Sequence, residues 1–416
     1  MNVREYGLVT TAYWGFTITD GALRMLVLLH FHELGYSPVQ LAFLFLLYEF
    51  CGILTNLLGG WIGSRVGLKA TLFAGLSVQV VSLVMLSLLN PVWAVALSVG
   101  YVMASQALSG VAKDLTKMSS KSAVKLLVPA RGDASESERL LFKLVAILTG
   151  SKNALKGVGF FLGAVLLSWL DFSAALWAMA GGLLIILLVC LIYLKGDIGK
   201  SKEKVRISKL FSKTREINYL SAARFFLFGS RDVWFVVGLP IFLTEILEWS
   251  FWETGGFMAL WVIGYGLVQA SAPAMVKKRT HGAVETGARA ALVWGIALVV
   301  ISAAIAAAVQ FDFYPKIAVL GGLAIFGLIF AVNSAVHSYL ILAYSDSDKV
   351  ALNVGFYYMA NAAGRLIGTL LSGVMYLKAG LEGCLWTSAA FVLAAVLITL
   401  ALPRKALPAE GNASVA

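Results

Sequence analysis

Residues 195–216 read KGDIGKSKEKVRISKLFSKTRE, the longest polar stretch in a chain of 416 residues that is 60% hydrophobic. The stretch holds eight Lys and Arg residues and lies at the midpoint of the chain. Apolar runs of about 20 residues, the length that spans a membrane as a helix, recur on both sides of it. It therefore predicts a linker between two membrane-embedded halves of similar length.

The composition indicates an integral membrane protein, because only 13% of the residues are charged, against about 25% in soluble proteins. Hydropathy and turn residues predict an all-α chain with twelve membrane-spanning helices, six on each side of the basic stretch. Their predicted ranges are 6–32, 39–62, 70–89, 92–112, 140–168, 173–194, 217–244, 253–276, 287–308, 315–342, 350–377 and 384–402.

The basic residues divide unequally between the two sides of the predicted membrane. Placing both termini in the cytoplasm puts 24 of the 33 Lys and Arg residues in cytoplasmic segments and only Lys316 and Lys378 in loops on the other side. This asymmetry agrees with the positive-inside rule. It also accounts for most of the net charge of +11, so the charge does not indicate a nucleic-acid partner.

Weak internal repetition supports two related halves. Asp20 and Arg231 are 211 residues apart, and Lys156 and Arg365 are 209 apart. Two six-helix halves around a central cavity are typical of major facilitator transporters. The predicted domains are an N-terminal half at 1–195, a basic cytoplasmic linker at 196–216, a C-terminal half at 217–403 and a short cytoplasmic tail at 404–416.

Beyond the first three residues of each predicted span, ten charged side chains fall within the spans, where each costs roughly 2.5–3.5 kcal/mol at mid-helix. They are Asp20, Arg24, Glu49, Lys143, Lys152, Lys156, Arg224, Arg231, Asp232 and Arg365. None lies in the third, sixth, ninth or twelfth span, which form the outer supports of the major facilitator fold. We therefore expect the ten to face a central cavity, most of them near the middle of the membrane.

Cations outnumber carboxylates by six to three in this set when Lys143, nearer the cytoplasm, is left aside. An excess of positive charge in a dry cavity favours an anion, and guanidinium groups suit the oxygens of phosphate-like anions. The predicted cargo is therefore a small, multiply charged organic anion. The predicted cationic ligands are Arg24, Lys152, Lys156, Arg231 and Arg365.

Some of these charges also allow a structural interpretation. Asp20 and Arg24 share one face of a helix and can neutralise each other. Glu49 can neutralise Lys152 and Lys156 in the same way. The carboxylates that could instead carry a coupling proton are Asp20, Glu49 and Asp232.

The charges of the seventh span and those near the cytoplasm are placed by helix geometry. Arg231 and Asp232 are about 100° apart around a helix, so we expect them to point toward different neighbours. Arg224 and Lys143 are expected to extend toward the cytoplasmic interface.

Polar residues of the tenth span form a further candidate set. Asn333 and His337 share one helix face, where they can either line the cavity or form hydrogen bonds in the core. The sequence has no nucleotide-binding loop, metal-ligand spacing or catalytic triad pattern. We therefore expect neither an enzyme nor a cofactor or metal site.

Residues 113–129, KDLTKMSSKSAVKLLVP, carry a lysine at every fourth position, beginning with Lys113 and Lys117. We place this stretch just after the fourth span, on the cytoplasmic side. It is either a solvated positive-inside element near anionic headgroups or, at Lys113 and Lys117, a surface that attracts the anion before it reaches the central charges.

Residues 59–69, GGWIGSRVGLK, resemble the major facilitator signature GxxxDRxGRK. The matching residues are Gly60, Arg65, Gly67 and Lys69. Ser64 replaces the aspartate of the signature and Leu68 replaces its next basic residue. The resemblance implies a conformational latch in this loop, weakened or built differently because the aspartate is missing.

Three stretches, together with the lysine repeat, resemble the organoarsenical efflux permeases of bacterial arsenic-resistance operons. They are TDGALRMLVLLHFHELGYSP at 19–38, YEFCGILTNLLGGW at 48–61 and NVGFYYMANAAGRLIG at 353–368. The resemblance implies a multi-pass protein of the bacterial inner membrane that exports 1-arseno-3-phosphoglycerate and confers arsenate resistance. It also implies a functional partner, the glyceraldehyde-3-phosphate dehydrogenase that makes this ester.

A two-ended anion suggests a division of the cationic ligands, with Arg24, Lys152 and Lys156 at one end and Arg231 and Arg365 at the other. Coupling to protons in an antiporter with alternating access is the expected mechanism. The alternative is a facilitator for another organophosphate or for an inorganic anion.

Overall fold

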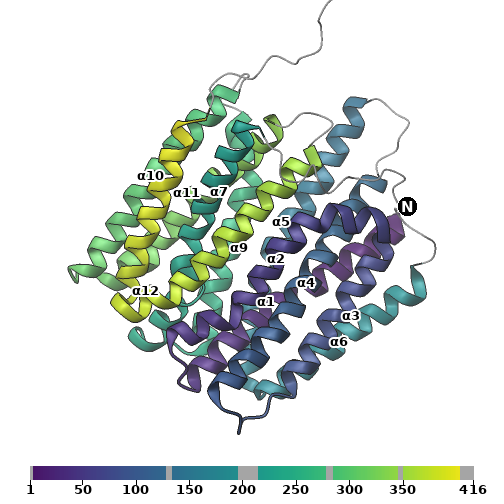
Figure 1. Cartoon of the computed structure of the whole chain (residues 1–416), viewed down its shortest axis with the longest axis horizontal. Coiled ribbons are helices and arrows are strands. Elements are labelled where there is room, and N and C mark those ends of the chain that lie inside the picture. The colour runs from purple at the N-terminus through teal and green to yellow at the C-terminus, as the bar shows by residue number, and fades with distance from the viewer. Residues whose placement is uncertain (1–2, 128–133, 195–213, 278–283, 345–349, 403–416) are drawn as a thin grey trace, which may run out of the picture.

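The computed structural model describes residues 3–127, 134–194, 214–277, 284–344 and 350–402, and within these ranges every regular element is a helix. Most of the predicted linker and the tail lie outside the described residues, as do the side chains of Lys143, Arg65 and the last two lysines of the repeat. Figure 1 shows the helices of the first part of the chain, in purple and blue, beside those of the second part, in green and yellow.

The helices follow the predicted order. Their bounds are α1 Val3–Glu33, α2 Pro38–Val66, α3 Leu68–Ser87, α4 Val95–Leu127, α5 Ala134–Trp169, α6 Phe172–Tyr193, α7 Arg215–Phe235, α8 Gly238–Ile241, the π-helix η2 Phe242–Ile246, α9 Phe251–Lys277, α10 Val284–Gln310, α11 Pro315–Ala343 and α12 Val350–Leu400. Non-helical backbone at Ala379 and Gly380 breaks α12 into the predicted eleventh and twelfth spans. Eight helices of the described residues are long and apolar enough to cross a membrane.

Two predicted helices differ from the structure. The fourth was expected to end at 112, but α4 continues to Leu127, so the lysine repeat is its last part. The seventh was expected to run unbroken to 244, but it ends at Phe235 and resumes as α8 and η2. Pro240 explains the break, because proline has no N–H and its ring clashes with the carbonyl four residues earlier. The amides of Val237 and Gly238 instead donate to Oγ of Ser372 on α12, both at 3.1 Å.

Glycines bring several pairs of helices into backbone contact, and two of these pairs are built alike. A Cβ atom added to Gly159 or Gly163 of α5 would lie 2.4 Å or 2.2 Å from a carbonyl oxygen of α1. A Cβ added to Gly364 or Gly368 of α12 would lie 2.0 Å or 2.6 Å from a carbonyl oxygen of α7. The α1–α5 and α7–α12 crossings therefore have the same construction, as expected of two related halves.

This construction corrects the predicted repeat. The glycines of α5 and α12 correspond at a spacing of 205 residues, and the α1 and α7 carbonyls that they meet correspond at 207. Arg24 therefore corresponds to Arg231, and Lys156 corresponds to Asn361. The spacings of 211 and 209 residues paired side chains that do not occupy equivalent places.

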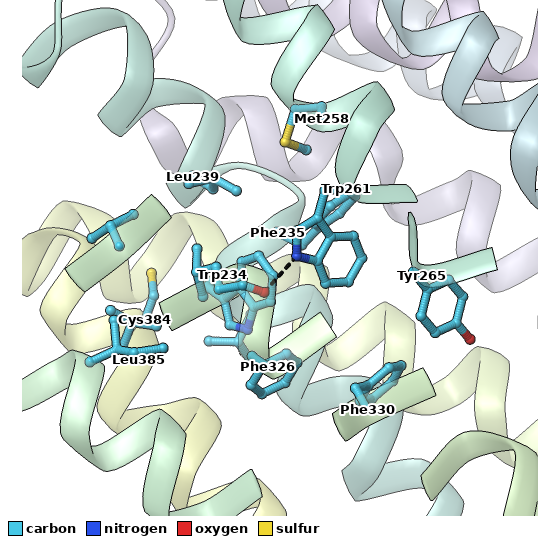
Figure 2. Close-up of a cluster of buried hydrophobic side chains, with 14 of the residues drawn as sticks. Trp234, Phe235, Leu239, Met258, Trp261, Tyr265, Phe326, Phe330, Cys384 and Leu385 are labelled. Atoms are coloured by element: carbon cyan, nitrogen blue, oxygen red, sulfur yellow. Dashed lines mark hydrogen bonds between the residues drawn. The ribbon is translucent and has the colours of Figure 1, made fainter. Parts of the chain in front are cut away.

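A large aromatic core lies among α7, α9 and α11 (Figure 2). Trp234 is fully buried and packs edge-on against Trp261 and Phe326. The indole of Trp261 donates to the carbonyl oxygen of Leu323 at 2.7 Å, so its N–H is satisfied within the core. This packing fixes the rotation of α7, and with it the direction of the charges on that helix.

The two parts of the bundle also meet closely at the end that holds the α1–α2 turn. A Cβ added to Gly373 of α12 would lie 2.3 Å from the carbonyl oxygen of Pro38 on α2. At the same end, Oγ1 of Thr244 lies 3.2 Å from Nε2 of His32. Backbone and side-chain contacts therefore join the two parts at this end.

Candidate functional site

Seven of the predicted charged residues come together in the interior, on α1, α2, α5, α7 and α12. They are Asp20, Arg24, Glu49, Lys156, Arg231, Asp232 and Arg365. We call them the central charge cluster. Each helix contributes only one or two of the charges. Most of the ion pairs therefore join different helices, some of them far apart in the sequence.

Glu49 is the centre of this cluster. Its side chain is fully buried, and its Oε1 accepts from Nη2 of Arg24 and from Nη2 of Arg365, both at 2.6 Å. These two bonds tie α2 to α1 and to α12, and thus link the first six helices to the rest of the chain. The sequence also allowed Glu49 to neutralise Lys152 and Lys156, but the structure pairs it with the two arginines.

Asp20 does not pair with Arg24, the partner that the structural interpretation of the sequence gave it. Its Oδ1 accepts from the Tyr48 hydroxyl at 2.6 Å, and its Oδ2 lies 3.8 Å from Nζ of Lys156. The described contacts include no ion pair between Asp20 and Arg24. Asp20 therefore joins α1 to α2 and α5, and Arg24 pairs with Glu49 instead.

Tyr48 is a residue of the site that the sequence analysis missed. Its ring faces the Arg24 guanidinium at 4.9 Å and Nζ of Lys113 at 4.0 Å, while its hydroxyl binds Asp20. An aromatic face stabilises a nearby cation through its quadrupole. Its position beside Glu49 in the middle of an apolar helix was the available signal.

Arg231 and Asp232 were expected to point toward different neighbours, and this expectation is wrong. Nε of Arg231 donates to Oδ1 of Asp232 at 2.6 Å, because the long arginine side chain folds back over its neighbour. Oδ2 of Asp232 also accepts from Nε of Arg365 at 3.0 Å. The Arg231 guanidinium lies over the rings of Phe228, Phe235 and Phe330, which hold it at the edge of the aromatic core.

Positive and negative charges in this cluster are closer in number than the six cations and three carboxylates that the sequence suggested. Four cations meet three carboxylates, and each of the four has a carboxylate partner. Arg24, Lys156, Arg231 and Arg365 each keep between 11% and 20% of the side chain exposed. Glu49 and Asp232, by contrast, are at most 1% exposed. The cations therefore face the accessible side of the cluster and the carboxylates lie behind them.

The other predicted ligands lie outside these ion pairs. Asn333 and His337 are each 2% exposed on α11. The amide nitrogen of Asn333 lies 3.8 Å from a Cβ built on Gly295 of α10, so this side chain packs toward an outer helix. Lys152 is on α5, one turn from Lys156, and has a partner of its own.

Arg224 was expected to extend toward the cytoplasmic interface, and this expectation is wrong. Its side chain is buried, at 3% exposure, and Nη1 donates to the carbonyl oxygen and the Oγ of Ser334 on α11, at 3.2 Å and 3.1 Å. The Phe228 ring covers its guanidinium at 3.8 Å. Aromatic packing thus keeps this cation inside the protein.

Lys117 is anchored and does not extend freely into solvent. Its Nζ donates to Oδ1 of Asn56 at 2.9 Å and lies 3.4 Å from Oδ1 of Asp114, whose side chain is buried. The same Nζ lies 5.2 Å from the ring centre of Tyr358 on α12. Oδ2 of Asp114 accepts from Oγ1 of Thr55 on α2. This arrangement joins α2, α4 and α12 at the end where the signature loop lies.

These contacts provide an acid near the signature loop, whose own aspartate is replaced by Ser64. Gly67 of the loop has φ of 89°, a conformation that favours glycine, and it precedes α3 directly. Lys69 lies over the Phe73 ring at 5.6 Å. Gly60 and Arg65 belong to α2, and the side chain of Arg65 lies outside the described residues.

We predict that Asp114→Asn lowers the free energy of unfolding by about 1–3 kcal/mol, because a charged acceptor for Lys117 and Thr55 is lost from a buried position. Thermal unfolding of the purified protein in detergent measures this change. Asp312→Asn is the matched control, because Asp312 is exposed in the α10–α11 turn at a φ of 52°, a conformation that asparagine tolerates. Equal stability of the two variants would mean that Asp114 does not hold α2 and α4 together.

The chain can be compared with known protein families, with curated sequences and with solved structures. A sequence model of the family described as "Major Facilitator Superfamily" matches residues 8–335. A search of curated protein sequences finds no significant match. In the described part of the chain, no group of three or more His, Cys, Asp or Glu residues could hold a metal ion.

Solved structures show the same fold. A crystal structure of a D-xylose-proton symporter superposes with a TM-score of 0.75 at 13% identity, over 97% of this chain and 98% of that one. A POT family transporter in complex with 5-aminolevulinic acid superposes with a TM-score of 0.72 at 14% identity, over 95% and 96% of the two chains. The predicted twelve-helix architecture is therefore confirmed, and the low identities leave the cargo open.

Proposed function

Because the chain belongs to the Major Facilitator Superfamily, and is thus a membrane transporter rather than an enzyme, we propose that it exports a small, multiply charged organic anion. The cargo that we propose is 1-arseno-3-phosphoglycerate, an ester with a phosphate at one end and an arsenate at the other. Export of this ester from a bacterial cell would confer resistance to arsenate.

The observation that carries the proposal is the set of three arginines in the central charge cluster. Arg24, Arg231 and Arg365 present their guanidinium groups on the accessible side, with carboxylates behind them. A guanidinium binds two oxygens of a phosphate or arsenate as it binds those of a carboxylate. The cargo can therefore replace Glu49 or Asp232 as the partner of one arginine, because each of these carboxylates keeps a second arginine as its partner.

Such an exchange also suggests how protons could be coupled to transport. Protonation of Glu49 would remove its charge and weaken its bonds to Arg24 and Arg365 together. Those two arginines lie on α1 and α12, on opposite sides of the contact between the two parts of the bundle. We propose that Glu49, with Asp20 and Asp232 as further carboxylates, links proton binding to anion binding in an alternating-access cycle: protonation frees the arginines for the anion, and deprotonation returns them to the carboxylate.

The test is growth on arsenate in an arsenic-sensitive bacterial host. We predict that the transporter raises the tolerated arsenate concentration only when a glyceraldehyde-3-phosphate dehydrogenase that forms the ester is expressed with it. Protection without the dehydrogenase would instead indicate an inorganic anion as the cargo. No protection in either case, with the protein present in the membrane, would exclude the arsenical and favour another organophosphate.

Variants of the arginines test the site within the same assay. We expect Arg365→Gln to abolish the protection, because it removes the guanidinium shared by Glu49 and Asp232. Arg215→Gln is the matched control: Arg215 lies at the start of α7 and is exposed, and its contact is with Tyr219. Full protection by Arg365→Gln would place anion binding elsewhere.

A further inference from the structure

Arg224 is a buried cation whose charge is not neutralised within the described part of the protein. Its hydrogen-bond acceptors are the two uncharged oxygens of Ser334, and its Nε, also buried, has no partner. The rings of Phe228 and Tyr357 cover the guanidinium at 3.8 Å and 4.9 Å. No described carboxylate forms an ion pair with it.

An unpaired charge in such a place is costly. The penalty for moving an ion out of water into a protein interior is several kcal/mol even after relaxation, and weak neutral acceptors offset little of it. One turn along α11 from Ser334, the imidazole of His337 is 2% exposed and its Nδ1 has no hydrogen-bond partner. Two polar groups on neighbouring helices thus lack the ligand that would satisfy both, and an anion is the ligand with the required charge.

The position of Arg224 relative to Arg231 indicates what kind of anion. The residues are seven apart on α7, so they lie on the same face and about 10 Å apart along the axis. Both guanidinium groups lie over the ring of Phe228, at 3.8 Å and 5.2 Å from its centre. The separation of the two guanidinium carbons therefore cannot exceed the sum of these distances, about 9 Å.

We propose that Arg224 and Arg231 bind the two ends of one anion, with Phe228 between them as the spacer. A three-carbon unit with a phosphate-like group at each end places its two charged heads roughly 7 Å apart, from bond lengths of about 1.5 Å. Arg224 with His337 takes one head, and Arg231 takes the other in exchange for Asp232. This inference rests on the proposed function and adds to it the subsite, Arg224 with His337, that binds the second charged end.

A polar connection shows how this subsite is linked to the rest of the bundle. Oγ of Ser334 accepts from Nε2 of Gln269 on α9 at 3.2 Å, and Oε1 of Gln269 accepts from Nδ2 of Asn153 on α5 at 2.9 Å. The bond from Asn153 to Gln269 crosses between the two parts of the bundle. Separation of α5 from α9 would break this bond and free Gln269, whose amide donates to Ser334 beside Arg224.

The experiment measures binding to the purified, full-length protein in detergent by calorimetry, with two stable probes. One is propane-1,3-diyl bisphosphate, which has two charged heads, and the other is propyl phosphate, which has one. We expect the wild type to bind the bisphosphate at least ten-fold more tightly. In Arg224→Gln this preference should fall below two-fold, because only one head of the bisphosphate can then be bound, and Arg215→Gln should behave as the wild type.

Equal affinity of the wild type for both probes, or binding of neither, would overturn the inference without any variant. A preference that persists in Arg224→Gln would overturn it as well. Arg224→Lys keeps the charge and serves if the glutamine variant does not fold; its preference should be reduced but measurable, because an ammonium lacks the planar fork. Growth on arsenate tests the cargo separately, so each proposal can fail while the other stands.

Discussion

Glu49→Gln is expected to abolish transport and to lower the free energy of unfolding by about 3–5 kcal/mol, the range measured when one member of a buried ion pair is removed. The reason is that one oxygen of Glu49 serves both Arg24 and Arg365. Loss of the charge leaves Arg24 with no carboxylate partner among the described residues, and Arg365 with only Asp232. Thermal unfolding and export by inverted membrane vesicles measure the two effects.

The double variant Glu49→Gln/Arg365→Gln provides the matching control for this prediction. It removes a cation together with the acid, so we expect it to be more stable than Glu49→Gln alone, although inactive. If the double variant loses as much stability as the sum of the two single changes, Glu49 and Arg365 do not interact and the central charge cluster is wrongly described.

Gly364→Ala is expected to have the largest effect on folding. Its added Cβ would lie 2.0 Å from the carbonyl oxygen of Phe225, a backbone atom that can move only if α7 and α12 separate. Such overpacking costs about 3 kcal/mol or more, at or beyond the upper end of the usual range. We predict little or no folded protein in the membrane, measured by size-exclusion chromatography after detergent extraction.

Gly181→Ala on α6 is the control for Gly364→Ala. A Cβ at Gly181 meets no atom within 4 Å, and alanine has the higher helix propensity, so this variant should be at least as stable as the wild type. A normal yield of folded Gly364→Ala would show that α7 and α12 do not cross as closely as described.

The twelve helices could be predicted from the sequence because their signal is local. Each is a long apolar run bounded by turn residues, and the placement of ten charges in five of the twelve already indicated which helices face the interior. The break at Ala379–Gly380 was predicted from the sequence, whereas the break after Phe235 was not. Gly238 and Pro240 were present in the sequence, but the apolar residues around them favoured one continuous span.

The partners of the charges could not be predicted in the same way. Glu49 and Arg365 are 316 residues apart, and their contact depends on the rotation and crossing of α2 and α12. Spacing along one helix suggested Asp20 with Arg24 and separated Arg231 from Asp232, because it considers directions from the axis and not the reach of long side chains. The interior position of Arg224 likewise follows from the rings of Phe228 and Tyr357, which lie on two different helices.

The glycine crossings restrict how the protein can move. Where α5 rests on α1 and where α12 rests on α7, backbone meets backbone, so neither pair can slide or rotate internally without steric overlap. Each pair therefore behaves as one stiff lever, and any motion between inward-open and outward-open forms is concentrated in the seam between the levers. That seam contains Glu49–Arg365 and Asn153–Gln269. The energy barrier to each turnover thus depends on the contacts across this seam, which also include the close approaches of Gly373 to Pro38 and of Gly157 to Ala259, while the packing within each lever stays unchanged.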